Sequence, residues 1–330
     1  MSAGLLTLPT ETAVGRAGTA DGAVAVVHLA WRPLGPAPLE RFLAAYRRAP
    51  AGMPHRLVVV YNGFSGERDR APFARRLAGV AHEPLVLSRP VQDLPAYLAA
   101  ARAVDAEYVC FLNSYSEPLA AGWLAKLHAH ASRPDVGLVG ASGSWESHYS
   151  NLARGLTAAY GGEPTGLAAL ALGARGPKSL AGYTWDWLRT RAAARRFEPF
   201  PAHHVRTNGF MLRRQLMLAL RWPAIRTKPD ALAFESGRAG LTRQIEARGL
   251  AALIVGRDGR AYAPADWWRS GTYRSGDQHN LLISDNRTRQ FGQLAARDAA
   301  ATARVVAETW GTDPAAAGRA LARPAPAAAV

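Results

Sequence analysis

The chain has 330 residues, of which 48% are hydrophobic and 20% charged, with a formal net charge of +15 and a pI near 10.8. This composition is typical of a soluble globular protein and excludes a mainly disordered one. Cys110 is the only cysteine, so no internal disulfide can form, and a reducing compartment is expected. The sequence shows no run of about 18 apolar residues and no secretory signal pattern, which predicts a cytoplasmic protein.

The excess of positive charge suits several kinds of partner. Lys and Arg neutralise phosphates in nucleic acids, but here they are scattered, and no metal-finger spacing or aromatic RNA-binding signature occurs. A nucleic-acid partner is therefore the weakest interpretation. Anionic small substrates, or peripheral contact with the inner face of a membrane, explain the charge equally well.

Apolar runs alternate with helical patterns in the first half of the chain. After residues 1–20, a Gly-, Ala- and Thr-rich stretch expected to be a flexible arm, buried strands are predicted at 23–30, 55–61, 84–88 and 108–112. Leu39, Phe42 and Leu43 recur at helical spacing, and residues 94–104 are Ala-rich and helical. Strands that alternate with helices predict a parallel βαβ sheet.

The stretch 106–126 is the centre of this pattern. Its apolar run ends at Asn113, and Leu119, Trp123 and Leu127 then recur at helical spacing, with Pro118 predicted in the first helical turn. Open α/β sheets bind ligands where buried strands end. A small-molecule site is therefore expected at Asn113 and the residues that follow it.

The second half is predicted less regularly. Strands are expected at 136–141, 203–212 and 250–256, and helices at 152–160, 185–196, 213–220, 237–249 and 295–310. Residues 262–291 are polar and aromatic without periodicity, and 311–330 form an Ala/Pro-rich tail expected to be disordered. We predict an α/β fold with a Rossmann-type, mostly parallel sheet flanked by helices, in one main domain over residues 21–310.

The order of these elements resembles the GT-A class of nucleotide-sugar glycosyltransferases, and within it the inverting family-2 group. The strands at 23–30 and 55–61, the helix at 93–104, the stretch 107–127 and the segment FESGRAGLTRQIEARGL at 234–250 carry the resemblance. It implies a hexosyltransferase that moves a sugar from a nucleoside-diphosphate sugar to an acceptor hydroxyl, in a surface polysaccharide or glycolipid. Residues 21–141 would form the donor half, and 142–310 the acceptor half and a lid.

One motif departs from that family. Its central strand ends in Asp-x-Asp, whose carboxylates hold a divalent metal on the donor diphosphate, whereas this chain has Asn113, Ser114 and Tyr115. Mg²⁺ or Mn²⁺ would lack two anionic ligands there, and the nearest carboxylate is Glu117. Two interpretations stay open: a metal-independent enzyme that uses Arg, Lys or His, or an inactive protein that binds the nucleotide-sugar without turnover.

The resemblance assigns the catalytic base to Glu235. A carboxylate there would take the proton from the acceptor hydroxyl as its oxygen attacks the anomeric carbon. The alternative is that Glu235 only stabilises the N-terminus of the helix that follows it.

Donor contacts are expected at the ends of the first four strands. The residues concerned are Trp31, Arg32, Asn62, Asp93, Asn113, Ser114 and Tyr115. Packing for Trp31, a turn for Asn62 and a helix cap for Asp93 are the structural alternatives.

The acceptor side and lid are expected from polar and aromatic residues later in the chain: Trp145, His203, His204, Arg206, Arg243, Trp267, Arg269 and Arg274. Aromatic faces such as that of Trp145 suit sugar C–H surfaces, although core packing is an equal alternative. Residues 262–291 are predicted to fold over the donor and exclude water, with an ordered surface loop as the alternative. A nucleotidyltransferase is disfavoured because residues 31–38 are Pro-rich and carry no Gly-rich phosphate loop.

Overall fold

The computed structural model describes residues 24–160 and 177–322. The predicted N-terminal arm, and residues 323–330 of the predicted tail, lie outside the described residues. Within the described ranges, no helix combines the length and the apolar character needed to cross a membrane.

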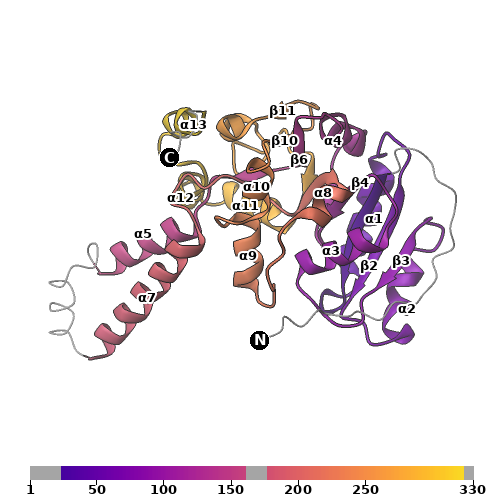
Figure 1. The fold of residues 1–330 in the computed structure, drawn as a ribbon, viewed down its shortest axis with the longest axis horizontal. Helices are drawn as coiled ribbons and strands as arrows, with labels where there is room; N and C mark the ends of the chain where they lie inside the picture. Colours follow the sequence, from indigo (N-terminus) through magenta and orange to yellow (C-terminus); the bar gives the residue numbers. More distant parts are fainter. Residues whose placement is uncertain (1–23, 161–176, 323–330) are drawn as a thin grey trace.

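An eight-stranded sheet forms the centre of the fold, in the order β11-β10-β6-β9-β4-β1-β2-β3 (Figure 1). β1 pairs in parallel with β2 and β4, β2 with β3, and β6 with β10, whereas β9 lies antiparallel between β4 and β6, and β11 is antiparallel to β10. The predicted mostly parallel, Rossmann-type sheet is confirmed. The strand bounds are β1 Val24–Trp31, β2 Arg56–Asn62, β3 Glu83–Val86, β4 Tyr108–Leu112, β6 Val136–Gly140, β9 Gly209–Arg213, β10 Ala251–Val255 and β11 Ala261–Tyr262.

Helices cover both faces of the sheet, which explains why its central strands are apolar on both sides. Val24 and Val26 of β1 face one core with α1, α2 and α4, and Ala25 and Val27 face the other with α3, α8, α9 and α10. The first layer consists of α1 Ala37–Arg48, α2 Glu67–Arg76 and α4 Trp123–Ala131. The second consists of α3 Asp93–Ala103, α8 Arg214–Ala219, α9 Lys228–Ser236 and α10 Leu241–Glu246. The short helix η1 Arg32–Leu34 follows β1 directly.

Two short pairs of strands lie beside the main sheet. β5 Glu117–Pro118 pairs with β12 Ile283–Ser284, and β7 Gly143–Ser144 pairs with β8 His204–Val205. Pro118 is therefore in a strand and not in a first helical turn as predicted. The predicted strand at 203–212 is instead β8 and β9, separated by a turn at Thr207 and Asn208. This turn proves central to the site.

The C-terminal part is packed more closely than the sequence predicted. It contains η2 Pro264–Arg269, α11 Asn286–Ala295, α12 Ala299–Trp310 and α13 Pro314–Ala322. Gly318 of α13 lies so close to η2 that an added Cβ would be 2.5 Å from the Ala265 carbonyl oxygen. The predicted disorder is therefore wrong for α13, because its Ala-rich sequence favours a helix and the helix has a surface to pack on.

Residues 262–291 contribute several side chains to the core of the protein. Trp267 and Leu282 are 0% exposed and belong to the two cores of the sheet. The sequence of this segment suggested a lid because the segment is polar and aromatic, but its aromatic side chains point inward.

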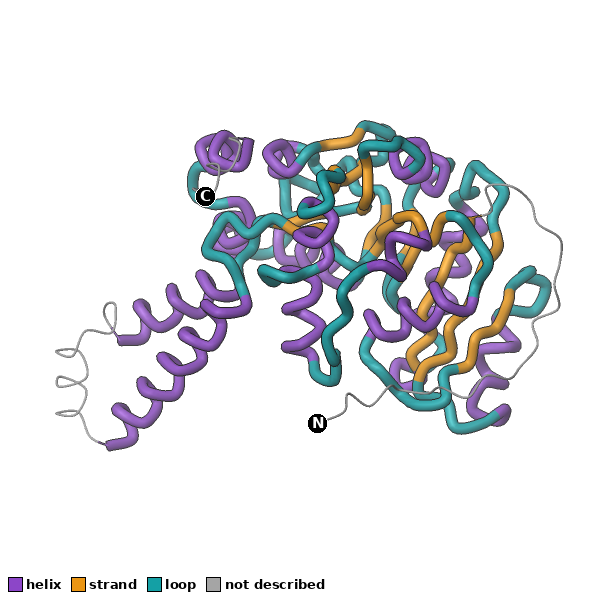
Figure 2. The backbone as a smooth tube through the Cα atoms, viewed as in Figure 1, coloured by secondary structure: helices purple, strands orange, loops and turns teal. Residues whose placement is uncertain are grey.

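Two helices extend away from the sheet as an antiparallel pair. They are α5 His148–Tyr160 and α7 Pro177–Arg196, at the left of Figure 1. Figure 2 shows that only the ends of this pair nearest the sheet approach the rest of the molecule.

Candidate active site

The polar residues predicted after several strands meet at one edge of the sheet. Trp31 at the end of β1 is opposite Asn62 at the end of β2, and Leu112 at the end of β4 is opposite Gly209, where the antiparallel β9 begins. The carboxyl ends of parallel strands and the start of β9 therefore share this edge. It is the position where open α/β sheets bind ligands.

Asn113 forms a turn at the tip of β4. Its Oδ1 accepts hydrogen bonds from Tyr115 N at 2.8 Å and from Ser116 Oγ at 3.0 Å, and Ser116 Oγ also contacts the Asn208 carbonyl. Ser114 is buried beside Trp31 in a narrow recess that Leu34 also lines. Four of the predicted donor residues, Trp31, Asn113, Ser114 and Tyr115, are thus close together. The Asn113 turn also contacts the segment between β8 and β9 through Ser116.

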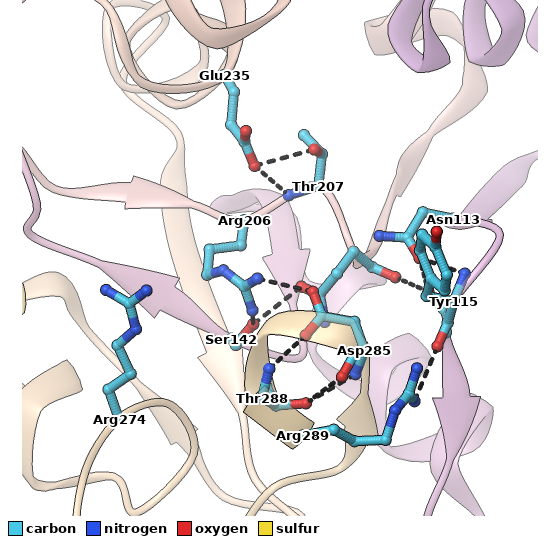
Figure 3. Close-up of polar contacts among 12 residues, drawn as sticks. Asn113, Tyr115, Ser142, Arg206, Thr207, Glu235, Arg274, Asp285, Thr288 and Arg289 are labelled. Atoms are coloured by element: carbon cyan, nitrogen blue, oxygen red, sulfur yellow. Dashed lines mark hydrogen bonds and ion pairs between the residues drawn. The ribbon is translucent and has the colours of Figure 1, made fainter. Parts of the chain in front are cut away.

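Glu235 lies at the same edge, attached to that segment. Its Oε1 accepts hydrogen bonds from Thr207 N at 2.7 Å and from Thr207 Oγ1 at 2.9 Å (Figure 3). In the described part of the chain, Oε2 has no hydrogen-bond partner. Thr207 precedes Asn208, whose carbonyl contacts Ser116. Glu235 is therefore connected with the Asn113 turn through Thr207 and Asn208.

Glu235 does not begin a helix, as the structural alternative required. It lies in the last turn of α9, which starts with a capping box between Thr227 and Asp230 and ends at Gly237. A carboxylate is unfavourable near a helix C-terminus, where the helix dipole is negative. The position of Glu235 therefore gives no benefit to helix stability.

The charge of Glu235 acts on both Asp93 and His204, and we call these three residues the crowded cluster. Burial raises the pKa of Asp93, and the charge of Glu235 raises it further, while Lys228 opposes both. Asp93 is nevertheless exposed, so it lies at the surface rather than in the core. Burial lowers the pKa of His204, against the opposing charge of Glu235, and its Nδ1–H donates to the Ala202 carbonyl at 2.9 Å.

Arg206, Asp285 and Tyr273 form a second group, the paired cluster. Arg206 Nη2 is 2.7 Å from Asp285 Oδ2, and its guanidinium lies 4.0 Å from the Tyr273 ring centre. Burial acts to raise the pKa of Asp285, but the charge of Arg206 and the Thr288 backbone N–H outweigh it and hold that pKa below its usual value. Ser142 Oγ joins the cluster to Asn208, accepting from Arg206 and donating to Asn208 Oδ1 (Figure 3).

A cation that the sequence reasoning missed lies beside the tip of β4. Arg289 Nη1 donates to the Tyr115 carbonyl at 3.2 Å and to Glu117 Oε1 at 2.9 Å, and Arg41 pairs with the same carboxylate at 3.2 Å. The sequence places Arg289 four residues after Asp285, which caps α11 in a capping box with Thr288. That box is the signal that could have predicted the start of this helix and the side of it that Arg289 occupies.

The residues at this tip do not fit a divalent cation. The Asn113 side-chain oxygen already accepts two hydrogen bonds, and Glu117 is balanced by two arginines. Within residues 24–160 and 177–322, no three His, Cys, Asp or Glu side chains group to hold a metal. A hard cation needs several anionic oxygens. This tip offers one carboxylate, Glu117, whose Oε1 already pairs with both arginines.

Several predicted contacts turn out to have structural roles. Trp145 and Trp267 are 0% exposed, and their indole N–H groups donate to the carbonyls of Pro264 and Tyr262. Trp145 therefore has no exposed face to stack on a sugar, as predicted for it, and Trp267 lies in the core rather than on the surface of a lid. Asn62 is also fully buried, and its amide exchanges two hydrogen bonds with the Val91 backbone. It fixes the loop that leads into α3 and Asp93.

The remaining predicted residues lie around the edge or away from it. His203 Nε2 lies 2.6 Å from Glu246, and Arg243 bridges Glu246 and Glu198, in a network beside the crowded cluster. The arginines at the periphery each have an acidic partner: Arg32 pairs with Asp69, Arg269 with Asp266 and Arg274 with Glu146. Tyr97 was not predicted, yet its buried hydroxyl, unpaired among the described residues, lies within the electric field of Asp93 and Glu235.

Comparisons with known proteins give a likeness among solved structures. No protein-family model and no curated protein matches the chain. A glucosyl-3-phosphoglycerate synthase from Mycobacterium tuberculosis, solved with Mn²⁺, UDP and phosphoglyceric acid, is 15% identical, with 71% of this chain and 68% of that chain covered and a TM-score of 0.41. A mannosyltransferase from Pyrobaculum calidifontis, solved with GDP-Man and Mn²⁺, is 19% identical over 36% of this chain and 34% of that chain, with a TM-score of 0.31. The chain thus matches about a third of the length of the mannosyltransferase.

Proposed function

We propose that this chain transfers a sugar from a nucleoside-diphosphate sugar to an acceptor hydroxyl, with Glu235 as the catalytic base. One observation carries the proposal. Glu235 has one oxygen fixed by two hydrogen bonds from Thr207 and the other without a described partner, at the sheet edge where a ligand is expected. A base needs this combination of a fixed position and a lone pair free to take a proton.

The charge around Glu235 supports a chemical role. Two carboxylates, Glu235 and Asp93, lie near enough to influence each other, and Glu235 occupies the unfavourable end of α9. Such an arrangement lowers stability, and sites of this kind are more often kept for chemistry than for folding. The two hydrogen bonds from Thr207 would hold the carboxylate ready for the acceptor.

The step is a direct displacement at the anomeric carbon. The acceptor oxygen attacks that carbon, its proton passes to Glu235 Oε2, and the bond from the sugar to the diphosphate breaks. The nucleoside diphosphate leaves with the electron pair, and the configuration at the anomeric carbon is inverted. Asn113, Ser114 and Tyr115 would contact the donor near Trp31, which lies over the turn at Gly63.

The diphosphate charge would be offset by protein cations rather than by a metal. Arg289 is the best-placed candidate, because it lies against Tyr115 and is about one-third exposed. Its guanidinium can bind phosphate oxygens through two N–H groups at once. The acceptor, expected to be a surface polysaccharide or a glycolipid, would reach Glu235 from the side of His203 and Arg243.

The test measures ligand binding and sugar transfer in the wild type and in one variant. A panel of nucleoside-diphosphate sugars is screened for thermal stabilisation with and without a chelator, because a ligand raises the melting temperature by mass action. The stabilising sugar is then used in transfer assays with a panel of hydroxyl acceptors. Glu235→Gln should keep the stabilisation and lose about 10²- to 10⁴-fold in turnover.

The matched control is Glu67→Gln, which changes an exposed carboxylate on α2 and should behave as the wild type. Full turnover in Glu235→Gln would refute its role as base. Stabilisation by a sugar nucleotide without turnover in the wild type would favour the inactive, ligand-binding interpretation, and indifference to the whole panel would reject the proposed substrate class. Stabilisation that the chelator abolishes would contradict the metal-independent arrangement alone.

A further inference from the structure

The pair of helices α5 and α7 is a separate structural unit at the periphery. Leu156 and Tyr183 form its small core, with Tyr160 and Trp187 packed against them. The Tyr160 hydroxyl donates to Asp186 at 3.4 Å, which turns the only acidic side chain of α7 toward α5. One face of α7 is therefore used for packing inside the pair, and the opposite face is left to solvent.

The outer face of α7 carries an apolar stripe. Ala181, Trp185, Leu188 and Ala192 are all exposed and follow one another at helical spacing of four, three and four residues. Trp185 is 64% and Leu188 50% exposed, and Val86 is the only other exposed large hydrophobic residue among those the structure describes. An exposed Trp next to an exposed Leu is costly in water unless another surface covers them.

Arginines line both sides of this stripe. Arg189 and Arg196 lie on one side of it around the helix and Arg191 and Arg195 on the other, and all four are exposed. Arg191 lies over the Trp187 ring at 4.9 Å, and Arg189 is only 3.5 Å from Asp186. The face that α7 presents to solvent is therefore apolar along its middle and positive along its edges.

We propose that this outer face of α7 docks on an anionic membrane surface. An amphipathic helix with Trp and Leu on one face and Arg beside them lies in the interface, with the apolar groups among the acyl chains and the guanidinium groups at the lipid phosphates. The pair extends away from the sheet, and only its near ends approach the rest of the molecule (Figure 1). The proposal does not depend on the proposed enzymatic function.

The charges favour a membrane over a second copy of the chain. Arg189 and Arg196 already pair with Asp186 and Asp230, but Arg191 and Arg195 have no acidic partner among the described residues. Two copies meeting through this stripe would bring these uncompensated charges of both copies together, and like charges at an interface oppose association. An anionic lipid surface instead attracts the same arginines while its hydrocarbon receives Trp185 and Leu188. We therefore take anionic lipid as the partner of this face, and the experiment also detects self-association.

The experiment is sedimentation of the full chain with vesicles. Vesicles of phosphatidylcholine mixed with phosphatidylglycerol are compared with pure phosphatidylcholine, at low and high salt. We expect binding to the anionic vesicles only, weakened by salt. The double variant Trp185→Ser/Leu188→Ser should bind at least tenfold more weakly, in keeping with the loss of two inserted apolar side chains. Arg191→Glu/Arg195→Glu should do the same by reversing two charges.

Matched controls distinguish binding by this face from non-specific hydrophobic adsorption and from non-specific charge attraction. Val86→Ser removes the other exposed apolar side chain, and Arg47→Glu/Arg48→Glu reverses two charges in the last turn of α1. Both controls should bind as the wild type. Each altered side chain is exposed, so melting temperatures should be unchanged, and Trp185→Ala/Leu188→Ala repeats the test if the serine variant is less stable.

Four results would overturn the proposal. They are equal binding to neutral and anionic vesicles, no binding to either, equal losses in the control variants, and a dimer in light scattering that Trp185→Ser/Leu188→Ser dissociates. The last result would instead assign the face to a second copy of the chain.

Discussion

The paired cluster and the crowded cluster are neighbours, yet their charges are arranged in opposite ways. His204 lies in β8, and Arg206 follows directly after the end of that strand. Arg206 is matched with Asp285 and covered by Tyr273, so each of these charges has a partner. Beside His204, by contrast, Glu235 and Asp93 are both acidic and influence each other unfavourably.

The difference separates support from chemistry. A buried ion pair with all its hydrogen bonds made holds segments together, and here it joins the start of α11 to the segment before β9. Neighbouring carboxylates that repel each other do not help folding, but they can exchange protons with a ligand. We therefore expect substitutions in the paired cluster to change stability, and substitutions in the crowded cluster to change activity.

The largest effect on stability is expected from Asp285→Asn. The change leaves Arg206, which is 9% exposed, without its counter-charge, and removing one partner of a buried pair costs about 3 to 5 kcal/mol. Denaturant unfolding at neutral pH measures the loss. Asp277→Asn is the matched control, because that carboxylate is exposed and pairs only with His279, and it should stay within about 0.5 kcal/mol of wild type.

The pH dependence gives the same prediction a second signature. The pKa of Asp285 is lowered in the folded protein, so ionised Asp285 contributes fully to stability above its ordinary pKa of 3.8. This contribution is lost as the pH falls from 3.8 through the lower pKa of the folded state. The stability difference between wild type and Asp285→Asn should be constant at neutral pH and shrink below about 3.8; a constant difference throughout would contradict the assignment.

The sequence predicted the sheet well because the sheet is buried on both faces. The central residues of β2, β4 and β6 are apolar, and those of β1 are apolar except for the buried His28. Strands covered on both faces have this pattern. The antiparallel direction of β9 and the pairing of β5 with β12 were not predictable in this way. Two-residue strands leave no periodicity, and the direction of a strand depends on its partner.

The site was predicted only as far as local patterns carry information. The tip at Asn113 and the placement of Glu235 at the same edge follow from strand ends and from the resemblance. Arg289 was missed because its contact with Tyr115 joins positions 174 residues apart. Trp145 and Trp267 were placed wrongly since an aromatic residue in a polar segment has the same sequence pattern whether it faces a ligand or the core.

A smaller effect is expected from Thr207→Val, which tests how the crowded cluster is held. The variant removes the hydroxyl that donates to Glu235 but keeps the backbone N–H bond. One neutral-to-charged hydrogen bond contributes about 1.5 kcal/mol, so kcat should fall by about tenfold while unfolding changes less than in Asp285→Asn. Thr207→Ser restores a hydroxyl and should recover most of the activity. Unchanged kcat in the valine variant would show that Thr207 does not position the base.

The smallest effect, and the most direct test of the comparison, is expected from Asp93→Asn. The pKa of Asp93 is raised by burial and then by Glu235, so its ionised form opposes folding. Protonated Asp93 contributes fully to the stability of the fold below about pH 3.8. This contribution is lost as the pH rises through the higher pKa of the folded state. Asp93→Asn should therefore be slightly more stable than wild type at pH 7, by less than about 1 kcal/mol because the side chain is solvent-accessible, and equal to it in acid.

A double-mutant cycle then identifies the source of this gain. If the charge of Glu235 contributes to it, the gain from Asp93→Asn should be smaller in a Glu235→Gln background, where one of the two causes is absent. Thermal unfolding of the four proteins at pH 7 measures the coupling, and Arg206 is unchanged in all of them. Equal gains in both backgrounds would mean that burial alone raises the pKa of Asp93, and that the two carboxylates act independently.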